Sequence, residues 1–285
     1  LRLTNHHGLM IAGEAALSNW DAGMDMYIYG KLGNLTMTKE GINVLMTNLT
    51  GKVPPILQRL DYIRFNGEAA GYLHDLTLTG LFHTGAGMVK TDVMMSIDEQ
   101  SMSRTYSGSV ASADLDLGKL LNQEKKFGKV DFNVELKGFN YKNRYPESYI
   151  KGIISSFEYS QYQYENIMLD GVYKDGGFNG RLSMDDANGS VQIDGNFNVA
   201  KTIPDFNLKA SVKNLRPHDL HLSDKYENAS ISLGLTADFT GKSIDDMNGR
   251  ISLDSLQLNA PDERGCFLDN LTITAGQVSG EKELR

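Results

Sequence analysis

The residues that most readily suggest metal chemistry in this chain are two close pairs of histidines. They are His6-His7 and His218-x-x-His221. Zinc takes three or four ligands from cysteine, histidine or carboxylate side chains, and no cysteine or glutamate stands at ligand spacing beside either pair. We therefore expect both pairs to lie in surface loops, and we predict neither a metal site nor a cofactor.

A five-residue acidic pattern, Asp-Asp-x-Asn-Gly, occurs at residues 185–189 and again at residues 245–249. Its carboxylate and amide oxygens are of the kind that Ca²⁺ binds. The same residue types also form tight turns, because Asn and Gly tolerate positive φ and Asp accepts hydrogen bonds from nearby backbone N–H groups. Both interpretations stay open, and the sequence favours a turn that is used twice.

The sequence has none of the common motifs that mark a catalytic nucleophile or a nucleotide-binding site. It has no Gly-x-Ser-x-Gly elbow, phosphate-binding loop, dinucleotide fingerprint or zincin motif. Cys266 lies close to Arg264 but has no histidine nearby in sequence, so we expect a free thiol. The sequence thus predicts a binding or structural surface and no enzyme.

The elements that carry these residues have a period of two. In residues 130–137 four apolar and four polar residues alternate strictly, and similar runs occupy 191–199, 206–213, 231–239 and 267–274. Successive side chains of a strand point to opposite faces, so each run has one apolar and one polar face. This predicts an all-β, antiparallel sheet with one face in water.

Turn signals and short helices complete this prediction. Asn-Gly or Asp-Gly pairs occur seven times, which is typical of tight hairpin turns, although the pair 194–195 lies inside an alternating run and indicates a bulge. Short helical turns are expected near 54–60, where prolines open the segment, and at 116–121, where Asp116 is the expected N-cap.

Composition and charge exclude several classes of protein. The net charge of −8 argues against nucleic acid as a partner, because phosphate binding requires a basic face. No apolar run approaches the roughly 18 residues of a membrane-spanning helix. The chain has 29 glycines and only 6 prolines, which suits a long bent sheet whose central strands need every backbone N–H.

The chain also repeats itself at intervals of about 100 residues. Ser109-Val110 followed by Asp116-Leu117 matches Ser211-Val212 followed by Asp219-Leu220. The run that starts at Val130 matches the run that starts at Ile231 in the same way. We predict repeat blocks at residues 1–128, 129–228 and 229–285, the last one partial, and we read the chain as a segment of a longer repeat protein.

Six stretches resemble TamB-type proteins, which belong to the AsmA-like, bridge-type lipid transfer proteins. They are Leu115–Leu121, Phe127–Val130, Gly152–Tyr159, Asn179–Asp186, Phe206–Leu215 and Ala237–Asp246. The resemblance follows the repeating order of that family over residues 9–275. It implies a taco-like trough, formed by a long curved antiparallel sheet with an apolar interior.

The resemblance further implies a periplasmic location in a Gram-negative envelope, within a protein anchored in the inner membrane. The family is linked to phospholipid movement between the two membranes and to outer-membrane protein assembly and secretion. The implied partners are phospholipid acyl chains and, through regions outside this chain, the inner membrane and an outer-membrane Omp85-type barrel such as TamA. We expect an N-terminal anchor helix and a barrel-docking domain to belong to other parts of such a protein.

Twelve alternating apolar residues are predicted to line the trough. They are Val130, Phe132, Val134, Leu136, Ile193, Phe197, Leu208, Val212, Leu233, Leu235, Ile251 and Leu253. Alternation alone does not distinguish an open trough from the core of a closed β-sandwich. The alternative is therefore a closed, adhesin-like or glycan-binding sandwich, with sugars stacking on a group of tyrosines at residues 141, 145, 149, 159, 162 and 164.

Overall fold

The structure is a computed structural model that describes residues 2–4, 8–19, 21–98, 100–101, 103–140, 147–225, 227–242, 246–260, 265–278 and 281–284. It divides into two compact units. The first comprises residues 1–144 and 154–161, and the second comprises residues 145–153 and 162–285. Strand β9 contributes its later residues to the first unit and its earlier residues to the second. The predicted block boundaries after residues 128 and 228 stay predictions.

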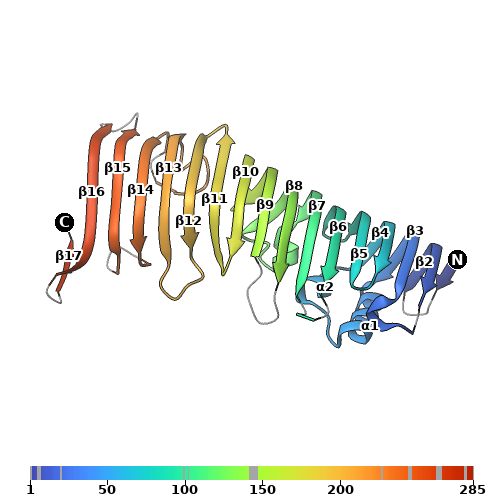
Figure 1. The fold of residues 1–285 in the computed structure, drawn as a ribbon. Helices are drawn as coiled ribbons and strands as arrows, with labels where there is room; N and C mark the ends of the chain where they lie inside the picture. The colour runs from blue at the N-terminus through green and yellow to red at the C-terminus, as the bar shows by residue number, and fades with distance from the viewer. Residues whose placement is uncertain are drawn as a thin grey trace. The chain divides into compact units, whose positions relative to one another are not determined.

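Nearly all of the regular structure consists of antiparallel strands, so the predicted fold class, an all-β open antiparallel sheet, is confirmed. Within each unit the strands lie side by side in chain order (Figure 1). The strands are β1 (Arg2–Thr4), β2 (Leu9–Ser18), β3 (Tyr27–Thr38), β4 (Tyr62–Tyr72), β5 (Asp75–Thr84), β6 (Gly87–Ile97), β7 (Arg104–Asp116), β8 (Phe127–Asn140), β9 (Glu147–Tyr159), β10 (Tyr162–Lys174), β11 (Gly177–Asp186), β12 (Gly189–Asn198), β13 (Asp205–Leu215), β14 (Ser230–Thr240), β15 (Asn248–Asn259), β16 (Cys266–Val278) and β17 (Glu281–Leu284).

Four short helices interrupt the strands of the first unit: η1 (Gly23–Asp25), α1 (Lys39–Thr50), α2 (Pro55–Gln58) and α3 (Leu117–Leu121). The predicted helical turns correspond to α2 and α3. Asp116 caps α3 as expected, since its carboxylate accepts a hydrogen bond from the Lys119 backbone N at 2.8 Å. The longest helix, α1, was not predicted. Within the described residues, none of these helices has the length and apolar character that crossing a bilayer requires.

In the first unit the helices cover one end of the apolar face of the sheet. Ile42 of α1 is 1% exposed and packs with Met37, Ile63 and Leu120. The remaining members of this cluster are Leu60, Ala86, Leu115 and Val130. This end of the first unit is therefore a closed core, in which helices and sheet exclude water from one another.

The second unit is built from β10–β17 and the first part of β9, and its strands make extensive contacts only with their neighbours in sequence. Directly paired residues of an antiparallel sheet lie on the same face, so the register defines apolar and polar rows. One apolar row runs across β10–β16 through Leu169, Leu182, Ile193, Ala210, Leu235, Leu253 and Leu271. The adjacent row, one residue along each strand, is polar throughout.

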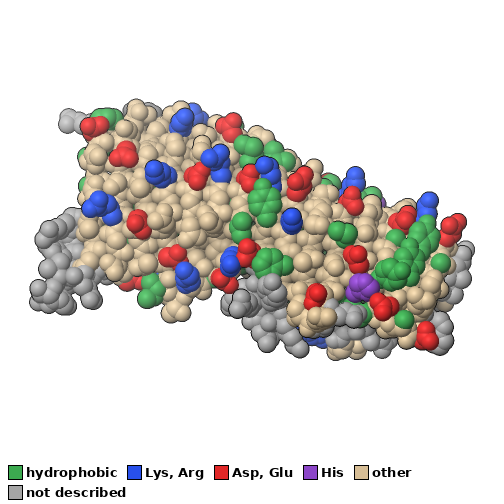
Figure 2. Space-filling view, in the orientation of Figure 1, with side chains coloured by type: hydrophobic (Ala, Val, Ile, Leu, Met, Phe, Trp, Pro, Cys, Tyr) green, Lys and Arg blue, Asp and Glu red, His purple; other side chains and the backbone are tan. Residues whose placement is uncertain are grey.

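Charges of opposite sign alternate along that polar row. Asp170, Arg181, Asp194 and Lys209 are paired in register on successive strands, and the guanidinium of Arg181 lies 2.9 Å from the Asp194 carboxylate. Figure 2 shows basic and acidic side chains interspersed over these strands. The exposed pairs contribute little energy each, but their alternation avoids repulsion between like charges on neighbouring strands.

The repeat of about 100 residues appears as repeated backbone structure. The register of β7 against β8 shifts at Asp114, and that of β13 against β14 shifts at Asn214, where both residues have positive φ of 52° and 49°. Gly87 opens β6 with φ 123°, and Gly189 opens β12 with φ 132°. An added Cβ on either glycine would clash with the backbone of the strand that bears the bulge. The predicted repeat thus places the same bulge and the same glycine in both units.

Most of the Asn-Gly and Asp-Gly pairs lie inside strands. Only the pairs at 175–176 and 188–189 form the hairpin turns of β10–β11 and β11–β12, whereas the other five fall within β4, β10, β11, β12 and β15. In the second unit, Gly171, Gly180 and Gly195 face one another across three strands. A Cβ on Gly195 would lie 2.3 Å from the Asn207 carbonyl oxygen. The backbones of β12 and β13 are therefore too close at this point for any residue other than glycine.

Candidate functional site

The predicted trough residues of the second unit share one face. Ile193 and Leu235 both pair with Ala210, Leu208 pairs with Ala237, and Val212 pairs with Leu233. The remaining predicted residues on these strands, Phe197, Ile251 and Leu253, lie in the same set of apolar rows. The register therefore brings all eight predicted residues of this unit onto one apolar face, which we call the second apolar face.

The four predicted residues of the first unit lie along β8. Val130 is 6% exposed and belongs to the core beneath the helices, and Phe132 packs against that core. Val134 pairs with Val110, and Leu136 pairs with Gly108, farther along the strand. This apolar face is therefore closed at its Val130 end and half-exposed beyond it.

The degree of burial distinguishes the open sheet from a closed sandwich. Of the twelve predicted residues only Val130 is buried, and the other eleven are half-buried. A second sheet packed face to face would exclude solvent from such side chains. The sheet is open, and the sandwich form of the fold is not observed.

A row of phenylalanines marks one end of the second apolar face. Phe178, Phe197, Phe206 and Phe239 pair in register on β11–β14. The rings of Phe206 and Phe239 stack with centroids 4.7 Å apart, and those of Phe178 and Phe197 lie 5.7 Å apart. Sequence reasoning identified only Phe197, although each of the others occupies the same distance from the end of its strand.

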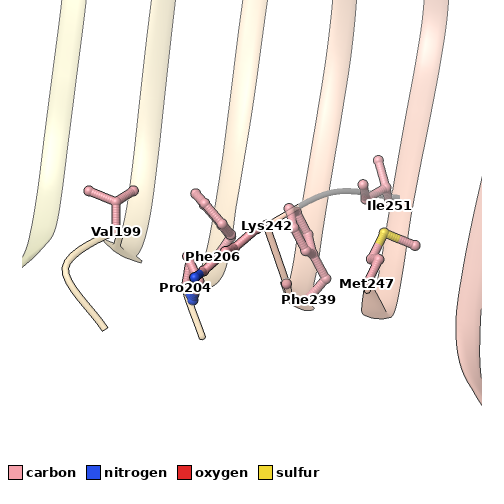
Figure 3. Close-up of a pocket in the computed structure, with 8 residues that line it drawn as sticks. Val199, Pro204, Phe206, Phe239, Lys242, Met247 and Ile251 are labelled. Atoms are coloured by element: carbon pink, nitrogen blue, oxygen red, sulfur yellow. The ribbon is translucent and has the colours of Figure 1, made fainter. Parts of the chain in front are cut away.

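An apolar pocket of about 420 Å³ lies at this end of the face. It is lined by Val199, Pro204, Phe206, Phe239, Gly241, Lys242, Met247 and Ile251 (Figure 3). Met247 is 2% exposed and forms a fixed part of the wall, whereas Val199 is 64% exposed and lies on the outer side. Figure 3 shows Phe206 and Phe239 on adjacent strands, with the Lys242 side chain extending from the turn after β14. The lining suits an apolar ligand that carries at most one charged group.

Three of the tyrosines predicted for sugar stacking make contacts within the second unit, and the first of them, Tyr149, donates a hydrogen bond to Asp170 at 2.8 Å. The buried Tyr164 donates a hydrogen bond to the Leu220 carbonyl oxygen at 2.7 Å, and its ring packs edge-on against Tyr162. The phenol of Tyr162 donates to Asp186 at 2.5 Å. Burial and this hydrogen bond raise the pKa of Tyr162 to about 12. Tyr141 and Tyr145 lie outside the described residues.

The first Asp-Asp-x-Asn-Gly pattern forms the hairpin turn between β11 and β12. Besides the Tyr162 phenol, Asp186 accepts hydrogen bonds from the backbone N of Asn188 at 2.9 Å and of Glu165 at 3.1 Å. Its carboxylate is thereby committed to the turn. In the second pattern Asp246 accepts two hydrogen bonds from the Lys242 backbone N, and Asp245 lies outside the described residues.

Across the described residues, His, Cys, Asp and Glu form no group of three or more with metal-binding geometry. His218 and His221 occupy one turn, in which the His221 backbone N donates to the His218 carbonyl oxygen. His6 and His7 fall in a part of the chain that is not described. Cys266 carries an exposed free thiol at the start of β16.

Fold and site together define an all-β repeat protein with open antiparallel sheets, each polar on one face and apolar on the other. Comparison with protein-family models, with curated proteins and with solved structures finds no match.

Proposed function

We propose that this chain is a non-enzymatic periplasmic segment of a TamB/AsmA-like protein whose apolar faces shield lipid acyl chains. In this role it serves phospholipid transport between the inner and outer membranes, and support of outer-membrane protein assembly and secretion is the other role that the family resemblance implies. The observation that carries the proposal is the second apolar face. Its apolar side chains form rows that continue from strand to strand, and they are half-exposed to solvent.

The energetic argument concerns the acyl chain more than its headgroup. Each CH₂ group removed from water contributes about 0.8 kcal/mol, so a 16-carbon chain in water costs on the order of 10 kcal/mol. A continuous apolar face lowers that cost at every position along the path. Because the face presents similar side chains in each row, a lipid loses little free energy when it moves from one strand to the next.

The opposite face supports the same assignment. Its rows are polar and carry alternating charges, as in the row from Asp170 to Lys209. The Lys151 ammonium and the Tyr149 hydroxyl, both hydrogen-bonded to Asp170, lower the pKa of its carboxyl. Asp170 therefore stays ionised, and this polar face offers no surface to acyl chains.

The test compares charge placed on the two faces of one strand. Leu235→Glu introduces a carboxylate on the second apolar face, and Thr236→Glu introduces one on the polar face at the next residue. Phospholipid that co-purifies with each variant is measured by native mass spectrometry, and the fold is checked by circular dichroism. We expect lipid to be lost from Leu235→Glu and retained by Thr236→Glu.

Transport itself is tested with Leu136→Glu, beyond the covered end of the first unit, and with Leu233→Glu in the second unit. Both should reduce the rate of lipid transfer between donor and acceptor vesicles while the sheet stays folded. Native transfer rates in both variants, or a wild-type protein that carries no lipid, would contradict the proposal.

A further inference from the structure

The pocket at the end of the second apolar face contains one cationic side chain, Lys242. Among the described residues Lys242 forms no ion pair, whereas Lys201 in the neighbouring loop is paired with Asp205 at 2.7 Å. The nearby carboxylate of Asp246 accepts two hydrogen bonds from the backbone N of Lys242, at 2.9 and 3.0 Å. This carboxylate thus holds the turn, and the Lys242 ammonium stays available to a ligand.

The rest of the lining can bind an acyl chain. The stacked rings of Phe206 and Phe239 form one wall, and the buried Met247 and half-buried Ile251 form another. Phe206 and Ile251 belong to rows that continue across the second apolar face. An acyl chain that lies along the face therefore reaches the pocket without crossing a polar row.

We propose that this pocket selects amphiphiles by headgroup charge and prefers an acyl chain whose headgroup is acidic and carries no balancing cation. This inference rests on the proposed function, because it requires acyl chains to occupy the face. The chain as a whole has a net charge of −8, which disfavours non-specific binding of anions. A preference for an anionic amphiphile would therefore have to originate at a local cation.

The size of the preference follows from the exposure of Lys242. Lys242 is exposed, and an ion pair at an exposed site is weak, so we expect a selectivity of about five-fold at moderate salt. Because exposed charges are screened, the selectivity should fall as ionic strength increases.

The experiment compares palmitate with 1-hexadecanol at pH 8, where the carboxylate is ionised and the alcohol is neutral. Both compete with a neutral apolar fluorescent dye for the protein. Wild type should bind palmitate about five-fold more tightly than hexadecanol. Lys242→Met should abolish the preference, so that palmitate and hexadecanol bind equally tightly, whereas Lys209→Met, on the polar face, should leave the preference at its wild-type value.

A second pair of variants tests the pocket at two exposed positions of one loop. Val199 lines the pocket and is 64% exposed, whereas Ile203, in the same loop, is 62% exposed and does not line it. Val199→Glu should weaken palmitate binding at least five-fold, and Ile203→Glu should leave it near the wild-type value.

The outcomes separate this inference from the proposed function. A palmitate preference that survives Lys242→Met, or binding that is indifferent to Val199→Glu, overturns the headgroup-selective pocket while acyl binding to the face stands. A wild-type protein that binds neither compound and carries no co-purified lipid overturns the proposed function as well.

Discussion

The covered end of the first unit and the open face of the second unit use the same strand pattern in opposite ways. In the first, α1, α2 and α3 lie over the apolar side chains, so that Ile42 is 1% exposed. In the second, the strands make extensive contacts only with their sequence neighbours, and Leu235 stays half-buried. Alternation therefore specifies which side of a strand is apolar, but insertions between strands decide whether that side becomes core or accessible surface.

The second unit also has a covered position in the loop between β13 and β14. Leu220 is fully buried there, and its carbonyl oxygen accepts a hydrogen bond from Tyr164. This loop follows the bulge that both units share, and in the first unit the corresponding connection carries α3. The repeat thus places a covering element after the same bulge in both units.

The largest expected difference between the two regions is in the cost of truncating an apolar side chain. Ile42→Ala should destabilise the first unit by about 3 kcal/mol, because it leaves a cavity in a closed core. Leu235→Ala should cost about 1 kcal/mol in the second unit, since water already reaches part of the side chain. Hydrogen exchange in increasing denaturant reports each unit separately. Equal costs would show that the two regions do not differ in coverage.

The next effect concerns the glycine row that bends the open sheet. Gly195→Ala should destabilise the second unit by about 2 kcal/mol, because an alanine at φ 144° is strained and its Cβ would meet the backbone of β13. Gly234→Ala is the matched control, since the nearest atom to its Cβ would lie 3.4 Å away. Thermal unfolding measures both, and a similar loss in the two variants would remove the special role of Gly195.

A smaller effect should appear in acid at the covered end. The Lys119 ammonium lies 2.6 Å from Asp61, and this hydrogen bond lowers the pKa of the Asp61 carboxyl below its ordinary value of 3.8. A lowered folded-state pKa contributes stability above the unfolded value that is lost as pH falls through the folded value. Below about pH 4 wild type should lose stability in this region, whereas Asp61→Asn should not show this component.

The measurement is hydrogen exchange of α3 and the adjoining strands as a function of pH. Asp61→Asn should reduce the pH dependence of the first unit and leave that of the second unit unchanged. An identical pH profile in wild type and variant would exclude a role for this ion pair in holding the covered end.

The last prediction concerns Tyr162, whose ring packs against Tyr164 beside the covered position of the second unit. Tyr162 has its pKa raised to about 12, chiefly by burial and also by the hydrogen bond to Asp186. This contribution to stability is fully present below about pH 10 and is lost as pH rises toward 12. The difference between the ultraviolet titrations of wild type and Tyr162→Phe isolates this phenol, and a midpoint near 10 would contradict the packed environment.

Much of the fold follows from local pattern. The alternating runs predicted the strands, Asp116 predicted the cap of α3, and the repeat of residues 109–117 at 211–220 corresponds to a shared bulge. Helix α1 was missed because Gly41, Ile42 and Val44 give it low helix propensity. It forms because Thr38 caps it and Ile42 is buried against the sheet, and the second of these contacts is tertiary.

The candidate site was predicted only in part. The side-chain direction within each strand is local, so the apolar side of Leu208, Leu235 and Ile251 could be read from alternation. The phenylalanine row and the position of Lys242 beside it depend on the register between strands and on the turns that set it. Five of the Asn-Gly and Asp-Gly pairs lie inside strands and not in turns, and the sequence did not predict this for most of them. A glycine inside a strand is required only where a neighbouring backbone comes too close for a Cβ atom, and that distance depends on the tertiary structure.

The amino-acid sequence alone accounts for the one-sided strands, their antiparallel order and the repetition of the unit, because each depends on residues close together in the chain. Tertiary structure decided which apolar positions are closed under helices, which stay open to a ligand, and where a cation stands next to them. Burial and register join residues that are distant in sequence, and the free energy of such contacts is absent from any local pattern.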